Sequence, residues 1–73
     1  MQPYRNVNGN SNVEAYKIGD NYIEVKFRGT AKIYCYSYNS AGMVHVEKMK
    51  ELAEQGHGLN SYIMKNARFG YEK

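Results

Sequence analysis

Cysteine, tryptophan and proline are nearly absent from this chain of 73 residues, which has one cysteine, one proline and no tryptophan. The single thiol, Cys35, cannot close an internal disulfide, and with only two histidines beside it a cysteine-rich zinc site is excluded. One free thiol is typical of a reducing compartment. No apolar run approaches the roughly 20 residues that cross a bilayer, and the first residues lack the apolar segment of a secretory signal. We therefore expect a cytoplasmic protein without membrane attachment.

The sequence also lacks any arrangement of residues that is typical of catalysis. His45 and His57 are twelve positions apart, and neither has a carboxylate spaced as a partner. There is no phosphate-binding glycine loop, no nucleophile elbow and no carboxylate pair. Cys35 lies within an alternating segment, on the side that we expect to face the core, where a thiol acts as a small hydrophobic group. We expect a protein that is not an enzyme and that requires no metal or cofactor.

Tyrosine and asparagine, in contrast, are abundant, with eight of each. Tyrosine combines a flat ring with a hydroxyl, asparagine offers adaptable hydrogen bonds, and both are common at binding surfaces. The net charge of +3 is mild, which favours a compact anion over a long nucleic acid as ligand. A domain this short buries only about 60% of the surface that its unfolded chain exposes. We therefore expect self-association to stabilise it.

Hydrophobic alternation predicts three strands in one domain at residues 12–73, after a flexible polar segment at 1–11. Residues 12–18 alternate loosely and residues 22–27 alternate cleanly, with Ile23, Val25 and Phe27 on one face. Residues 31–38 alternate again. Gly19-Asp20-Asn21 and Arg28-Gly29-Thr30 supply the turn residues between these segments.

Helical periodicity follows the strands. Apolar residues recur at three- and four-residue spacing at Met43, Val46, Met49, Leu52 and Ala53. Asn39 or Ser40 can cap this helix, Gly56 ends it, and a second short helix is expected from Leu59 to about Asn66. The predicted fold is α+β: a three-stranded antiparallel meander followed by one or two short helices (β-β-β-α-α) that cover one face.

The strand at residues 31–38 carries the strongest binding signal. Its smaller side chains, among them Ile33 and Cys35, are expected to face the core. The opposite face then presents a cation and three phenols in a row: Lys32, Tyr34, Tyr36 and Tyr38. Rings about 6.6 Å apart can stack nucleobases, while Lys32, helped by Arg28 from the preceding turn, meets phosphate. Alternatively, the tyrosines pack beneath a helix or a dimer partner, or pair across strands.

A second group of candidate ligand contacts lies near the end of the chain. Lys65 and Arg68 could bind phosphate, Asn60 and Asn66 could bind base edges together with Asn12, and Tyr71 adds an aromatic ring. The alternative is a solvated surface, because isolated cations on small domains usually bind nothing specific.

Several short motifs, taken in order, resemble the KTSC domain, a family named for its occurrence at the C-terminus of some lysyl-tRNA synthetases. The resemblance covers roughly residues 10–71. Its motifs are Ser11-Asn12-Val13, the Ile23-x-Val25-x-Phe27 strand, Tyr34-Cys35-Tyr36 at the centre, and Gly58-Leu59-Asn60-Ser61-Tyr62-Ile63. Ala41-Gly42 stands where the family usually has a proline, Leu59 replaces an aromatic residue, and Tyr62 stands where histidine is common.

KTSC domains have been described as of unknown function, with RNA binding as one suggestion, and small free-standing members occur in bacteria and phages. Phage proteins of similar size and composition resemble sponges that sequester the cyclic nucleotide signals of antiviral systems such as CBASS. By this analogy we expect a non-enzymatic sponge in the bacterial host cytoplasm, with its ligand between the protomers of a homo-oligomer. The alternatives are an accessory domain that binds single-stranded RNA or tRNA, and a module that binds a protein partner.

Overall fold

The computed structural model describes residues 1–9 and 11–72. Asn10, within the expected flexible segment, and Lys73, at the expected end of the domain, therefore lie outside it. The strands are β1 (Gln2–Pro3), β2 (Val13–Ile18), β3 (Tyr22–Phe27) and β4 (Ile33–Ser37); the helical segments are α1 (Met43–Gln55), α2 (Leu59–Tyr62) and the π-helical η1 (Ile63–Ala67).

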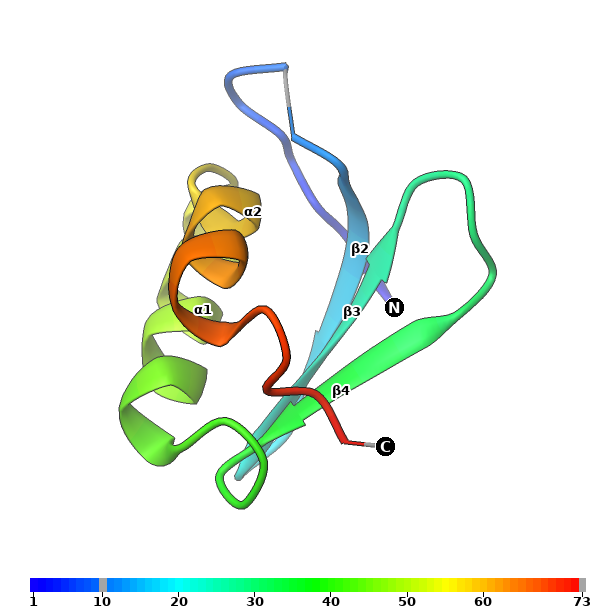
Figure 1. Cartoon of the computed structure of the whole chain (residues 1–73). Coiled ribbons are helices and arrows are strands. Elements are labelled where there is room, and N and C mark those ends of the chain that lie inside the picture. The colour runs from blue at the N-terminus through cyan, green and yellow to red at the C-terminus, as the bar shows by residue number, and fades with distance from the viewer. Residues whose placement is uncertain (10, 73) are drawn as a thin grey trace.

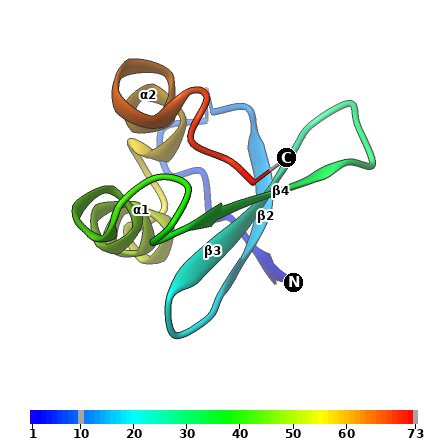
Figure 2. The ribbon, with the colours of Figure 1, turned by 60° about the horizontal axis from the view of Figure 1, so that its bottom comes forward.

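The strands form one antiparallel sheet in the order β1-β2-β3-β4, with the helices together on one side of it (Figures 1 and 2). The expected α+β class, with an antiparallel sheet followed by two short helical segments, is thereby confirmed. No helix among the described residues is long and apolar enough to cross a bilayer.

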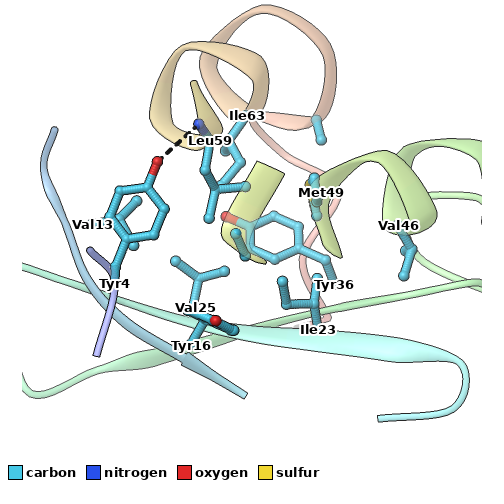
Figure 3. Packing of buried hydrophobic residues seen from close by; sticks show 12 residues of the cluster. Tyr4, Val13, Tyr16, Ile23, Val25, Tyr36, Val46, Met49, Leu59 and Ile63 are labelled. Carbon is cyan, nitrogen blue, oxygen red and sulfur yellow. Dashed lines mark hydrogen bonds between the residues drawn. The ribbon is translucent and has the colours of Figure 1, made fainter. Parts of the chain in front are cut away.

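The start of the chain contributes a fourth strand, so the expected count of three was wrong. Gln2 pairs with Tyr16 and Pro3 with Ala15. Proline, which has no backbone N–H, is tolerated at such an edge. Tyr4 follows at only 6% exposure, and its hydroxyl accepts a hydrogen bond from the Leu59 backbone N–H at 3.3 Å (Figure 3). Tyr4 therefore belongs to the core, whereas residues 7–9, within the expected polar lead-in, are exposed.

The two faces of β4 are the reverse of the sequence-based expectation. Tyr36 pairs with Ile23 and Tyr34 with Val25, and residues directly opposite each other in an antiparallel pair lie on the same face. Ile23 and Val25 are fully buried, so the tyrosines face the helices: Tyr36 is 1% exposed, whereas Ile33 is 48% exposed. The expectation was wrong because it ranked the side chains by size and polarity, while the register with β3 decides the face.

Cys35 accordingly lies on the sheet face away from the helices, opposite Glu24, and is half-buried. Partial burial, and then the charges of Glu72 and Glu24, raise the pKa of its thiol. A raised pKa keeps the thiol protonated and a poor nucleophile.

Helix α1 buries most of the expected stripe: Val46, Met49 and Ala53 are almost completely inaccessible and Leu52 is half-buried, whereas Met43, at the first turn, is 58% exposed. It ends at Gly56, whose φ of 81° is left-handed and whose backbone N–H donates to the Leu52 carbonyl at 3.0 Å. A Cβ at Gly56 would lie 2.8 Å from that of Arg5, so any larger residue would clash with the start of the chain.

The expected cap of α1 by Asn39 or Ser40 was wrong. The cap position is Gly42, which forms no side-chain cap hydrogen bond. Ser40 instead holds the end of the chain in place, because its hydroxyl donates to the Gly70 carbonyl at 2.7 Å. The chain returns in this way from η1 to the edge of β4, where the Glu72 backbone N–H donates to the Cys35 carbonyl at 2.7 Å (Figure 1).

Candidate functional site

An open cavity of about 340 Å³ lies between the inner face of the sheet, the α2–η1 segment and the C-terminal segment. Pockets for small ligands usually hold about 300–1,000 Å³, so this one suits a group the size of a single nucleotide unit. Six of the predicted contacts line it: Asn12, Tyr34, Tyr36, Asn60, Arg68 and Tyr71. Four further lining residues were not among the predicted contacts: Phe27, Thr30, Met64 and Phe69.

The aromatic wall of the cavity is built from rings that pack edge to face. The Tyr34 ring lies 5.6 Å from that of Phe27 and 4.8 Å from that of Tyr71, measured between centroids. Tyr36 and Tyr71 are 6.2 Å apart in a similar arrangement. Each such pair contributes roughly 0.5–1.5 kcal/mol beyond its buried area. The expected row of free stacking phenols is therefore replaced by a packed cluster that lines the cavity.

Tyr36 provides a polar group at the bottom of this cavity. The residue is 1% exposed and lines the cavity, and its hydroxyl has no hydrogen-bond partner within residues 1–9 and 11–72. Since no completely buried side-chain nitrogen or oxygen in these residues lacks a partner, the hydroxyl keeps a small exposed area. A phenol without a partner in a cavity lining can donate a hydrogen bond to a ligand that reaches it.

Burial, followed by the neighbouring Tyr34 and Tyr71, raises the pKa of Tyr36 from 10.0 to about 12. Because the folded state holds this proton more tightly, the resulting stabilisation is complete below pH 10 and is lost as the pH rises through about 12. As the pH rises through this range, we expect ionisation of Tyr36 to reduce the free energy of unfolding by roughly 2 kcal/mol or less. Urea unfolding at a series of pH values should therefore show a smaller decrease in the free energy of unfolding for Tyr36→Phe than for the parent. Equal decreases in both proteins would contradict the raised pKa of Tyr36.

The mouth of the cavity is cationic and aromatic. The Arg68 guanidinium lies 5.4 Å from the centre of the Phe69 ring, and Phe69 is 72% exposed. Lys32 is outside the lining, but its ammonium lies 4.9 Å from the centre of the Tyr34 ring and 5.8 Å from that of Tyr71, which both line the cavity, and we call this position the rim. No carboxylate is among the described residues that line the cavity. The potential at the mouth therefore favours an anion.

Two asparagines complete the site. The Asn12 backbone carbonyl accepts a hydrogen bond from the Arg28 N–H at 2.8 Å, which ties the start of β2 to the end of β3. Asn60 follows Gly58 at the start of α2, is half-buried and also borders a smaller cavity of about 110 Å³. Neither side-chain amide has a partner among the described residues, so both donors and the acceptor of each are available to a ligand.

The other predicted contacts lie elsewhere. Tyr38 donates its hydroxyl to Glu47 at 2.6 Å, a bond that raises its pKa, and Lys50 lies 5.7 Å from its ring centre. Arg28 is exposed in the loop after β3, outside the cavity lining. Lys65 and Asn66 line a neighbouring cavity.

The missed residue with the clearest role is Phe69. Its only signal in the sequence is an aromatic ring next to Arg68 in a short polar tail. Phe27 was expected in the core, and it does pack against the core while its edge contributes to the cavity. Thr30 and Met64 line the cavity because of the path of the loop before β4 and the position of η1, which no residue pattern predicted.

The described residues of the cavity lining supply phenols, amides, a guanidinium and apolar groups, and no histidine, cysteine or carboxylate is among them. Residues 1–9 and 11–72 contain no group of three histidine, cysteine or acidic side chains that could hold a metal ion.

Comparison of the chain with protein-family models, with curated proteins and with solved structures finds no match.

Proposed function

We propose that this chain binds a nucleotide in the cavity and sequesters it without chemical change. The observation that carries the proposal is the pairing of two features in one open cavity. The first feature is a set of neutral hydrogen-bonding groups in the lining: the Tyr36 hydroxyl and the side-chain amides of Asn12 and Asn60. The second is the Arg68 guanidinium, which lies beside the exposed Phe69 ring at the mouth. Nucleotides present the complementary groups: a polar base edge, a flat base and an anionic phosphate.

In this mode the base enters the cavity and meets Tyr36 and the asparagine amides with its edge. Phe69 offers a stacking surface at the mouth, and base–aromatic stacking contributes about 1–3 kcal/mol. Arg68, with Lys32 at the rim, meets the phosphate through charge-assisted hydrogen bonds. In this mode the tyrosines of β4 contact the ligand through a hydroxyl and through ring edges, and the base stacks on Phe69 of the C-terminal segment.

Sequestration follows from what lines the cavity. The lining residues that the structure describes include no histidine, cysteine or carboxylate, the groups that most often transfer protons near neutral pH, so we expect a bound nucleotide to leave unchanged. The motifs that resemble KTSC domains agree with such a role, and we propose cyclic nucleotide signals of bacterial antiviral defence as the ligands. The protein would then act in the cytoplasm of the bacterial host.

Self-association is part of the proposal. One chain builds the whole cavity lining described above, but the cavity is open on one side. A second protomer placed over the mouth would enclose the ligand more completely.

Single-stranded RNA is the second candidate ligand, and one observation favours it. Phe69 is exposed beside Arg68 at an open cavity, which also suits one base of a strand that continues past the protein. A protein partner docked on the tyrosine face is disfavoured, because Tyr36 is buried beneath the helices and Tyr34 is half-buried there.

Calorimetry distinguishes the two ligands. For sequestration we expect saturable binding of at least one cyclic di- or trinucleotide. Affinity should depend only weakly on salt, because few phosphates are contacted. For RNA, affinity should rise with oligonucleotide length and fall steeply with salt. Saturable binding of neither class would overturn the proposed function.

A further inference from the structure

A second cavity of about 480 Å³ adjoins the first, on the other side of the C-terminal segment. The two cavities share three lining residues, Met64, Arg68 and Phe69. The Arg68–Phe69 pair therefore borders both cavities, and we call this pair the ridge. A ligand larger than one nucleotide could cross this ridge and occupy both cavities.

The second cavity has the electrostatic character needed to hold an anion. Lys65 and Arg68 both line it, and none of the ion pairs found among the described residues involves either of them. No carboxylate contributes to the part of its lining that the structure describes. Asn66 donates its side-chain NH₂ to the Tyr62 carbonyl at 3.3 Å, which leaves its side-chain oxygen as an acceptor.

The ridge is held in place by contacts of the adjoining Gly70 with the loop between β4 and α1 and with η1. The Ser40 hydroxyl donates to the Gly70 carbonyl at 2.7 Å, and the Gly70 backbone N–H donates to the Ala67 carbonyl at 2.9 Å. A Cβ added at Gly70 would lie 3.1 Å from that of Ala41, so the segment packs closely there. A wall fixed on both sides is a suitable support for one phosphate group.

We infer that the ligand consists of two nucleotide units joined by phosphodiester linkage, with one base in each cavity and a linking phosphate at Arg68. Lys65 and the Asn66 oxygen then contact the second unit, and the exposed Met64 and Phe69 contribute apolar area to both. This inference rests on the proposed function, and it adds the size of the ligand and a second subsite. A mononucleotide would fill only the first cavity and would leave Lys65 without a contact.

The test compares ligands of one and two units on the wild type and two variants. The probes are AMP and GMP against cyclic di-AMP and cyclic di-GMP, measured by calorimetry. We expect at least one cyclic dinucleotide to bind about tenfold or more tightly than its mononucleotide, and Lys65→Ala to weaken only the dinucleotide, by about five- to twentyfold. The control is Lys17→Ala, which removes an equal charge from an exposed position on β2. It should leave the affinities for the mononucleotide and the dinucleotide within about twofold of the wild type.

Each outcome has a distinct meaning. Equal affinity for one and two units, or an equal effect of Lys65→Ala on both, would overturn the second subsite and leave the proposed function standing. If no wild-type binding of either class is found, the proposed function and the subsite both fall.

Discussion

Replacing Tyr36 with phenylalanine is expected to weaken nucleotide binding by about 10- to 100-fold while the fold is retained. The substitution removes one oxygen and leaves the ring. That ring fills the core beneath the helices, and the hydroxyl holds no other residue in the described part of the chain. A ligand atom that accepts from this hydroxyl would be left buried and unpaired, which costs roughly 1–3 kcal/mol.

The matched control for this substitution is Tyr22→Phe. Tyr22 is half-buried on the sheet face away from the helices, where it pairs with Ser37. The Tyr22→Phe variant should bind nucleotide with an affinity within about twofold of the parent's, since Tyr22 lies outside the cavity lining. Calorimetry measures the affinities, and thermal unfolding should place the midpoint of Tyr36→Phe within about 5 °C of the parent. Undiminished binding by Tyr36→Phe would remove this hydroxyl from the site.

Truncation of the same residue to alanine should have the largest effect on stability. Tyr36→Ala empties a fully buried ring position between the sheet and the helices (Figure 3). Loss of a buried aromatic side chain costs about 3–5 kcal/mol, which is a large part of the roughly 5–15 kcal/mol that holds most domains together. We expect the variant to be largely unfolded or to unfold at much lower urea concentration.

Ile33→Ala is the partner measurement on the same strand. Ile33 is 48% exposed and faces away from the helices, so its truncation should cost about 1 kcal/mol or less. Urea unfolding of both variants reports the orientation of β4 directly. A greater loss in Ile33→Ala than in Tyr36→Ala would restore the orientation that side-chain size predicts.

The orientation of β4 also illustrates how far the fold can be predicted from the sequence. Local periodicity correctly placed the strand at residues 22–27 and the helix that ends at Gly56, because both signals lie within one segment. The inward face of β4 depends on its register with β3, which is a contact between segments. Likewise, β1 is two residues long and is held by β2, so no local pattern could indicate it.

The candidate site divides in the same way. Asn12, Asn60, Arg68 and Tyr71 were predicted from residue type and motif, and the fold brings them to one cavity with Tyr34 and Tyr36. Tyr38 shares the face of these tyrosines but lies beyond the reach of the cavity, beside Glu47. Phe69 could not be predicted as a candidate contact, since its proposed role depends on its exposure at the mouth of the cavity and on the Arg68 guanidinium beside it.

The central claim, that one nucleotide cavity lies between the helices and the inner face of the sheet, is tested most directly by mapping amide chemical shifts during nucleotide titration. ¹⁵N-labelled protein is titrated with whichever cyclic nucleotide calorimetry selects. The largest shifts should fall on Asn60, Arg68 and Phe69, with residues outside the cavity lining, such as Lys17 and Ile18 of β2, unchanged. Shifts confined to residues outside the cavity lining would contradict the claim.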